Sequence, residues 1–88
     1  MYYVYVIQNE NNELYIGYTH DLKRRLEEHN TGKTSYTSHH SWELVYYEAY
    51  RSKADATQRE AKLKQRGQSK RWLKERIAHS IVETSRQS

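Results

Sequence analysis

The first nineteen residues constrain the fold more than any other part of the chain. Residues 2–8 and 14–18 are rich in β-branched and aromatic side chains and lack helical spacing, so both segments are predicted to be strands. The polar, asparagine-rich residues 9–13 between them favour a turn. The sequence therefore predicts an antiparallel hairpin, in which Gly17 at the end of the second strand marks either a close approach or an unusual backbone.

A helix is predicted directly after the hairpin, over residues 20–29. Thr19 is expected to cap its N-terminus, because a threonine hydroxyl can accept a hydrogen bond from the first turn. Leu22 and Leu26 lie one turn apart and are expected to form the buried stripe of this helix. Residues 30–32, which end in glycine, provide the stop signal.

Three further elements are predicted in the second half of the chain. Residues 42–51 read as a third strand, apolar enough to be the best buried of the three. Ser52 is expected to cap a second helix over residues 53–65, and a third helix is predicted over residues 70–78. The order ββαβαα indicates an α+β fold, with a three-stranded antiparallel sheet flanked by helices.

Length and composition narrow the function classes. At 88 residues the chain is expected to form one domain over residues 1–82, followed by a polar tail at 83–88. It contains no cysteine, which excludes a disulfide framework, a thiolate zinc site and a thiol nucleophile. No apolar run approaches the roughly 20 residues of a membrane-spanning helix, so a cytoplasmic protein without a membrane partner is expected.

The positive charge is concentrated in the second half. Residues 53–76 carry nine Lys or Arg against three acidic residues, a balance of +6, whereas residues 1–52 carry five against seven, a balance of −2. A polyanionic partner such as DNA would explain this asymmetry, and a solvated helix surface would explain it equally well. The candidate nucleic-acid-binding residues are Lys23, Arg24, Arg59, Lys62, Lys64, Arg66, Lys70 and Arg71.

Arg25 and His29 are four residues apart and are therefore predicted to project from one face of the first helix. An arginine suits a phosphate clamp, because its guanidinium stays charged and can bind two oxygens at once. The alternative is an ordinary amphipathic helix with a charged outer side. Tyr5 and Tyr15 can meet across the hairpin, although tyrosines also fill half-buried sheet positions for purely structural reasons.

Glu60 is the unusual acidic residue of the second helix. It shares a helical stripe with Ala56 and Leu63, which should face the sheet. One carboxylate can anchor Mg²⁺ when water and phosphate oxygens complete the coordination shell. The alternative is an ordinary ion pair with Lys64, one turn further along the helix.

These residues, taken in order, resemble the GIY-YIG nuclease superfamily. Its two name-giving motifs correspond to residues 3–5 and 15–17, its arginine to Arg25 and its metal-binding glutamate to Glu60. His29 stands where members of the family carry His or Tyr. The resemblance extends from residue 2 to about residue 75, and it is closest to the small stand-alone bacterial branch, similar to the N-terminal domain of the excision-repair incision subunit.

The resemblance implies a DNA endonuclease that uses Mg²⁺ or Mn²⁺, in DNA repair or processing. Glu60 would hold the metal, Arg25 would neutralise transition-state charge, and Tyr15, or as second choice Tyr5, would help to deprotonate the attacking water. His29 would relay or orient a proton. We expect these five side chains to converge on one solvent-open cleft. The alternative readings are an inactive or weakly active nucleic-acid-binding module of the same fold, and a structural or protein-interaction role.

Overall fold

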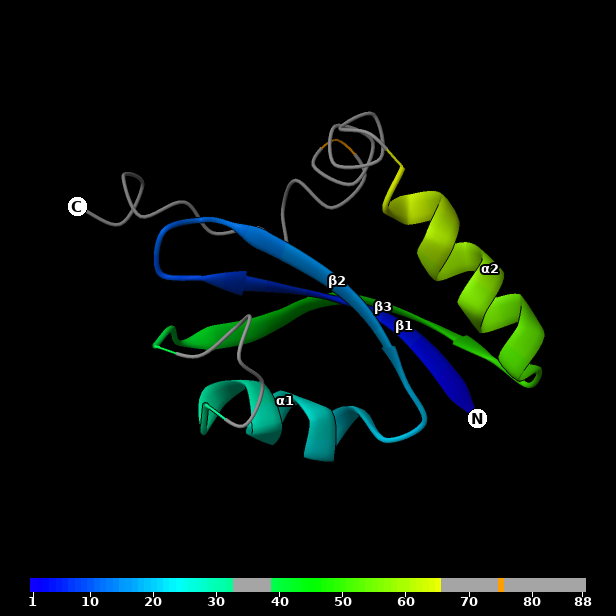
Figure 1. The fold of residues 1–88 in the computed structure, drawn as a ribbon, viewed down its shortest axis with the longest axis horizontal. Coiled ribbons are helices and arrows are strands. Elements are labelled where there is room, and N and C mark those ends of the chain that lie inside the picture. Colours follow the sequence, from blue (N-terminus) through cyan, green and yellow to red (C-terminus); the bar gives the residue numbers. More distant parts are fainter. Residues whose placement is uncertain (33–38, 66–74, 76–88) are drawn as a thin grey trace.

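The computed structural model describes residues 1–32, 39–65 and 75 of the chain. They form a three-stranded antiparallel sheet with one helix on each face (Figure 1). The elements are β1 (Tyr2–Asn9), β2 (Leu14–Thr19), α1 (Leu22–Asn30), β3 (Trp42–Tyr50) and α2 (Lys53–Leu63). The predicted α+β class and the order of these five elements are confirmed. The predicted third helix lies outside the described residues, apart from Glu75.

The described sheet has the strand order β2-β1-β3, so β1 is its central strand. Val4, Val6 and Ile7 of β1 are completely buried. The expectation that the third strand would be the best buried is wrong, because β3 lies at the edge of this sheet and most of its side chains are exposed or half-buried. A strand that is paired on both sides and covered on both faces loses more surface than an edge strand.

Successive side chains of β1 serve opposite faces of the sheet. Val4 and Val6 pack with Ala56 and Leu63 of α2. The opposite face, under α1, carries a second apolar cluster. This cluster consists of Tyr5, Ile7 and Trp42, with Tyr15, Leu22 and Leu26 packed against it. Leu22 and Leu26 therefore face the sheet as predicted, but both side chains are half-buried instead of buried.

The start of α1 differs from the prediction. Asp21, not Thr19, is the N-cap residue, and its carboxylate accepts a hydrogen bond from the backbone N–H of Arg24 at 3.2 Å. Thr19 is still paired with Tyr3 in the hairpin, so its backbone belongs to the sheet. Its hydroxyl instead accepts from the backbone N–H of Asp21 at 3.0 Å and shapes the turn into the helix. The predicted Ser52 cap of α2 is confirmed.

Asn30 joins the end of α1 to the start of β3. Its side-chain amide donates to the carbonyl oxygen of Trp42 at 3.0 Å and accepts from the backbone N–H of Trp42 at 2.7 Å. Both hydrogen bonds are of the kind that a neighbouring strand would supply. One side chain therefore fixes the positions at which the chain leaves α1 and enters β3.

Glu48 of β3 joins the sheet to α2. Its carboxylate accepts two hydrogen bonds from the guanidinium of Arg59, at 2.9 and 3.1 Å, and further ones from the hydroxyl groups of Tyr46 and Tyr50. A planar guanidinium that binds both carboxylate oxygens fixes orientation as well as distance. This contact fixes the rotation of α2 about its axis, and with it the direction in which the next residue, Glu60, points.

We expect the stability of the protein to fall in acid. Burial opposes ionisation of Glu48, but the hydrogen bonds from Arg59 and the tyrosines outweigh it and lower its pKa. The hydrogen bond from His40 and that from the backbone of Ser41 lower the pKa of Glu10 to about 2. Both carboxyl groups bind protons more weakly in the folded chain, so their stabilisation is complete above the unfolded pKa near 4.5.

This stabilisation should be lost as the pH falls from about 4.5 towards about 2. Urea unfolding at a series of pH values measures the effect. Glu10→Gln, which removes one of the two groups, should make the decline shallower. A free energy of unfolding that stays constant between pH 7 and pH 3 would contradict the expectation.

Within the described residues, no helix combines the length and the apolar character that crossing a membrane requires.

Candidate active site

Gly17 makes the room that Tyr5 occupies. The two residues are directly paired between β1 and β2, and the Tyr5 side chain is only 2% exposed. A Cβ atom at position 17 would lie 2.3 Å from the phenol oxygen of Tyr5 and 2.4 Å from its Cζ. The predicted close approach at Gly17 is confirmed, and the group that approaches is the phenol of the first motif.

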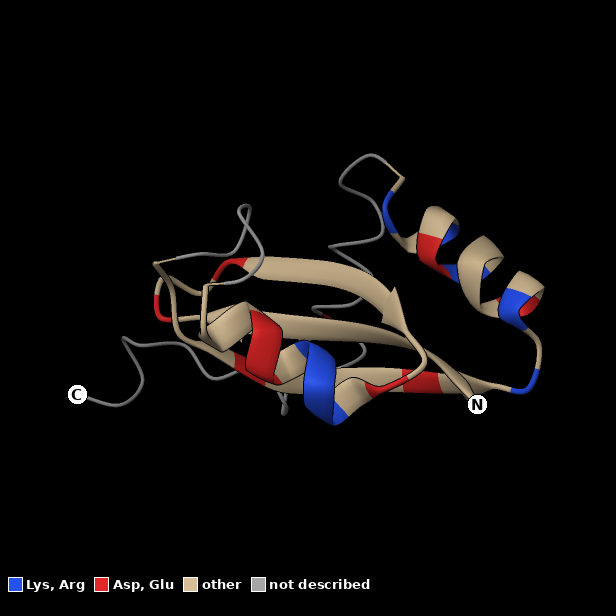
Figure 2. Cartoon of the chain, turned by 60° about the horizontal axis from the view of Figure 1, so that its bottom comes forward, with Lys and Arg blue, Asp and Glu red and all other residues tan. Residues whose placement is uncertain are grey.

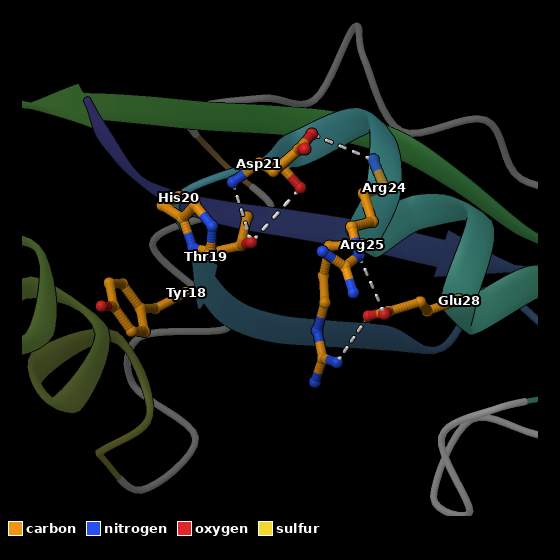
Figure 3. Close-up of a pocket in the computed structure, with 7 residues that line it drawn as sticks. All are labelled: Tyr18, Thr19, His20, Asp21, Arg24, Arg25 and Glu28. Atoms are coloured by element: carbon orange, nitrogen blue, oxygen red, sulfur yellow. Dashed lines mark hydrogen bonds and ion pairs between the residues drawn. The ribbon is translucent and has the colours of Figure 1, made fainter.

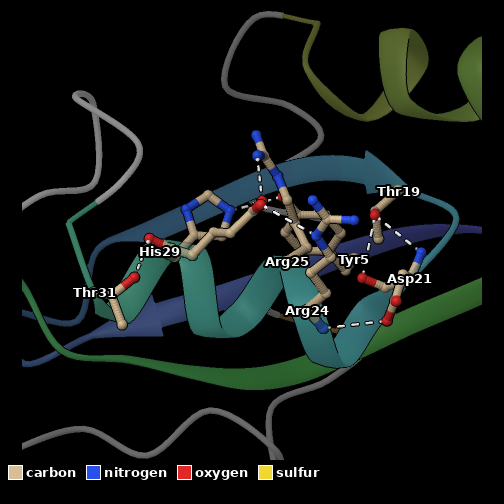
Figure 4. Close-up of polar contacts among 8 residues, drawn as sticks. Tyr5, Thr19, Asp21, Arg24, Arg25, His29 and Thr31 are labelled. Atoms are coloured by element: carbon tan, nitrogen blue, oxygen red, sulfur yellow. Dashed lines mark hydrogen bonds and ion pairs between the residues drawn. The ribbon is translucent and has the colours of Figure 1, made fainter.

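The hydroxyl group of Tyr5 connects two side chains of α1. It lies 2.8 Å from Nε2 of His29, and it accepts a hydrogen bond from Nε of Arg25 at 3.3 Å. Figure 4 shows both side chains of α1 turned towards the Tyr5 phenol. The predicted shared face of Arg25 and His29 is thus the face that meets the first strand.

Burial determines the charges in this group. It raises the pKa of Tyr5 to about 12, although the hydrogen bond from Arg25 acts in the opposite direction. Burial and the nearby Arg25 charge lower the pKa of His29, which is completely buried. At neutral pH, therefore, the phenol of Tyr5 keeps its proton and the imidazole of His29 is uncharged.

Tyr15 lies between the hydrogen-bonded pair of Tyr5 and His29 and the end of α2. Its ring centroid is 5.0 Å from that of His29 and 6.5 Å from that of Tyr5. The ammonium group of Lys64, just after α2, lies 5.9 Å from the Tyr15 ring centroid, within the range of a cation–π contact. The predicted meeting of the two tyrosines is confirmed, and the contact continues to the end of α2.

Glu60 is placed on the inner side of α2. It is half-buried, on the stripe that contains Ala56 and Leu63, and its carboxylate forms an ion pair with Lys64 at 3.0 Å. Three effects raise the pKa of Tyr5. Burial is the largest, the electrostatic interaction with Tyr15 is the second, and the interaction with the Glu60 carboxylate is the third. Although α1 and α2 cover opposite faces of the sheet, Glu60 is therefore within electrostatic reach of the cluster beneath α1.

A pocket of about 300 Å³ opens beside the first turn of α1 (Figure 3). Arg25 is the one predicted catalytic residue on its wall. Tyr5 and His29 lie behind it in the protein interior, so the expected arrangement of all five side chains around one solvent-open cleft is wrong. The lining residues are Tyr18, Thr19, His20, Asp21, Arg24, Arg25 and Glu28.

The carboxylates near the candidate site suit a magnesium or manganese ion that is bound by one protein side chain and completed by water and phosphate, and not an ion enclosed by several protein ligands. Among the described residues, no three His, Cys, Asp or Glu side chains come together as a metal-binding group. Mg²⁺ commonly takes one or two protein carboxylates and completes its shell with water and substrate phosphate oxygens. Glu60, with a side chain 22% exposed, can provide such a carboxylate once Lys64 moves away from it.

The described candidate basic residues lie on or just after the two helices (Figure 2). In α1 the basic positions are followed by acidic ones, and in α2 basic and acidic positions are interspersed. Lys23 and Arg24 are exposed on α1 and Lys62 on α2. Arg24, Arg59 and Lys64 also make ion pairs within the protein, with Glu28, Glu48 and Glu60 respectively. Arg66, Lys70 and Arg71 lie outside the described residues.

Glu28 was not identified from the sequence, although it contacts Arg25 on the wall of the pocket. Its spacing of three and four residues from the two arginines of α1 is the signal that could have identified it.

Known proteins share both the sequence and the fold. The family model described as "GIY-YIG catalytic domain" matches residues 1–74. A UPF0213 protein from Streptococcus agalactiae serotype V is 47% identical over 66 residues, which cover 73% of this chain and 75% of that protein. A UPF0213 protein from Streptococcus pyogenes serotype M5 is 46% identical over 66 residues, covering 73% and 72%.

The solution NMR structure of the UPF0213 protein BH0048 from Bacillus halodurans superposes with a TM-score of 0.52 at 33% identity. The match covers 82% of this chain and 80% of that one. The two motif strands, the α1 arginine and the α2 glutamate all lie within the residues that the family model matches. The chain belongs to the GIY-YIG catalytic domain family.

Proposed function

We propose that this protein is a divalent-metal-dependent endonuclease that hydrolyses phosphodiester bonds in DNA, in a cytoplasmic repair or processing role. The observation that carries the proposal is the position of Arg25. Its guanidinium is held by Tyr5 at 3.3 Å and by Glu28 at 3.1 Å, on the wall of a pocket that can admit a backbone phosphate. Family membership supports a nuclease site at this place.

Arg25 is assigned to the charge that develops on the phosphate. A guanidinium that the Tyr5 hydroxyl already holds before the substrate arrives can stabilise the additional negative charge of the transition state with little reorganisation. The hydrogen bond to Tyr5 raises the pKa of Arg25, so this side chain stays positively charged. Tyr5 is thereby assigned to positioning, since its own phenol is buried and titrates only at about 12.

Tyr15 is assigned to the attacking water. Its ring is half-buried at the edge of the cluster, and the ammonium group of Lys64 lies 5.9 Å from the ring centroid. His29 packs against this ring and accepts or donates at the Tyr5 hydroxyl, so it orients both phenols. In this assignment Tyr15 gives up its own proton to solvent and accepts the water proton as a phenolate, while the buried Tyr5 keeps its proton.

Glu60 would hold Mg²⁺ or Mn²⁺, and the bound ion would supply Lewis-acid polarisation of the phosphate and stabilisation of the leaving oxygen. Lys64 would then change partner, from the carboxylate of Glu60 to the phosphate backbone. The ion pair at 3.0 Å places this lysine where it can contact a substrate held beside Glu60.

We expect the protein to cleave branched, nicked or single-stranded DNA in the presence of Mg²⁺ or Mn²⁺, and to stop when the metal is removed with EDTA. Gel separation of end-labelled substrates measures the products. Glu60→Gln keeps the shape of the side chain but removes its charge, so cleavage should require a higher metal concentration. An unchanged metal dependence in this variant would refute the role given to Glu60.

The second candidate is a nucleic-acid-binding module without catalysis. The ion pair between Glu60 and Lys64 favours it, because this contact satisfies the one carboxylate to which metal binding is assigned. Such a module would bind DNA with a strong dependence on salt and give no product with any divalent metal. Glu60→Gln would change its affinity for DNA by the same amount in EDTA and in Mg²⁺, because no metal site would be lost.

A further inference from the structure

Glu28 lies between the two arginines of the pocket at the start of α1. One of its carboxylate oxygens is 3.1 Å from Nη1 of Arg25, and the other is 3.5 Å from Nε of Arg24. Figure 3 shows the carboxylate turned towards both guanidinium groups. The three side chains line the same pocket, and that of Glu28 is 26% exposed.

The Glu28 carboxylate contacts the two arginines in the way that a backbone phosphate of DNA could. A phosphodiester has two non-bridging oxygens that share one negative charge, as a carboxylate does, and guanidinium groups bind both kinds of anion in the same way. The side chain of Arg24 is 72% exposed and that of Arg25 is 34% exposed, so a ligand from solution can reach both. The carboxylate of Glu28 occupies the position between them.

The charge of the pocket also depends on Glu28. Two arginines face two carboxylates, those of Asp21 and Glu28. The Asp21 carboxylate is engaged by the backbone N–H of Arg24 at the helix N-terminus, whereas Glu28 contacts the guanidinium groups themselves. Glu28 is therefore the acidic group that directly offsets the arginine charge in the DNA-free protein.

We propose that this pocket binds one backbone phosphate of DNA, and that Glu28 is the resident counter-ion which the phosphate displaces. The inference rests on the proposed function in one respect, that DNA is the ligand. Binding is then an exchange of one anion for another at two arginines. The affinity of the protein for DNA is lower than the arginines alone would give, and a phosphate must compete with Glu28 to bind.

The test is DNA binding by Glu28→Gln, measured by fluorescence anisotropy of a labelled oligonucleotide in EDTA, so that no cleavage occurs. At about 0.1 M salt we expect binding to tighten by about 2- to 5-fold, the range of a partly exposed charge contact. The plot of log affinity against log salt should also steepen by up to about one unit, since one more net positive charge meets the phosphates.

Glu27→Gln is the matched control. It makes the same change of net charge one residue earlier on α1, and Glu27 is exposed and does not line the pocket. It should tighten binding much less. Thermal melting checks that Glu28→Gln is folded. If it is unstable, Glu28→Ala provides a second variant, because alanine has a high helix propensity.

A gain that disappears when Arg25→Gln is added to Glu28→Gln supports competition for this guanidinium. If Glu27→Gln tightened DNA binding as much as Glu28→Gln, the gain would come from net charge alone, and the proposal would be overturned. Weaker binding by Glu28→Gln would overturn it as well, because Glu28 would then support the arginines. Cleavage assays decide the proposed function separately, since a protein that never cleaves can still show the Glu28 effect.

Discussion

Replacing Arg25 with glutamine is expected to lower the rate of metal-dependent DNA cleavage by about 10²–10³-fold, the usual effect of removing one preorganised group that stabilises transition-state charge. Glutamine keeps a polar side chain at the site but removes the charge beside the Tyr5 hydroxyl. Because the Arg25 contact acts to lower the Tyr5 pKa, its loss should raise that pKa further. Single-turnover kinetics at saturating protein measures the chemical step apart from binding.

Lys23→Gln is the matched control for this prediction. It removes one positive charge from the same helix, at an exposed position outside the pocket. It should weaken DNA binding modestly and leave the single-turnover rate nearly unchanged. If the two variants lose the same amount of activity, the role of Arg25 is general attraction of DNA and the catalytic assignment is incorrect.

Replacing Gly17 with alanine is expected to reduce both stability and activity. The new methyl group would lie 2.3–2.8 Å from three atoms of the Tyr5 phenol, so the ring must move. Tyr5 is 2% exposed and packed against His29 and Tyr15, which leaves it little space. Overpacking of this kind costs about 1–3 kcal/mol. Each kcal/mol lowers the Tm of a domain of this size by about 4–8 °C.

The activity loss in Gly17→Ala should exceed what unfolding explains, because moving the phenol breaks its hydrogen bonds to Arg25 and His29. Tyr5→Leu removes the ring that the methyl group meets. The double variant should therefore be more stable than the sum of the two single losses predicts, a coupling that thermal or urea unfolding can measure. Additive losses would show that residue 17 is constrained by something other than Tyr5.

Those parts of the fold that depend on local pattern could be predicted from the sequence. The hairpin follows from two β-rich segments around a polar turn, and the Ser52 cap follows from one hydroxyl before a helix. The close approach at Gly17 could also be predicted, because a glycine inside a strand often marks one. Which residue approaches it could not, since this depends on the register between β1 and β2.

Features that depend on tertiary arrangement were beyond the sequence. The third strand has an apolar composition, yet it lies at the edge of the described sheet, and no local pattern specifies strand order. Thr19 and Asp21 are both good capping residues, and the choice depended on where the strand pairing with Tyr3 ends. The burial of Tyr5 and His29 results from α1 packing on β1, which places two of the five candidate residues in the interior.

The double hydrogen bond between Asn30 and Trp42 has a consequence for protein engineering. These hydrogen bonds hold the end of α1 next to the start of β3, so both ends of the connection between them are fixed. Lengthening a connection whose two ends are already fixed costs only about 0.6 kcal/mol for each doubling of its length. We therefore expect extra residues inserted after Gly32, such as a reporter tag, to leave the buried phenol and the arginine pocket in place.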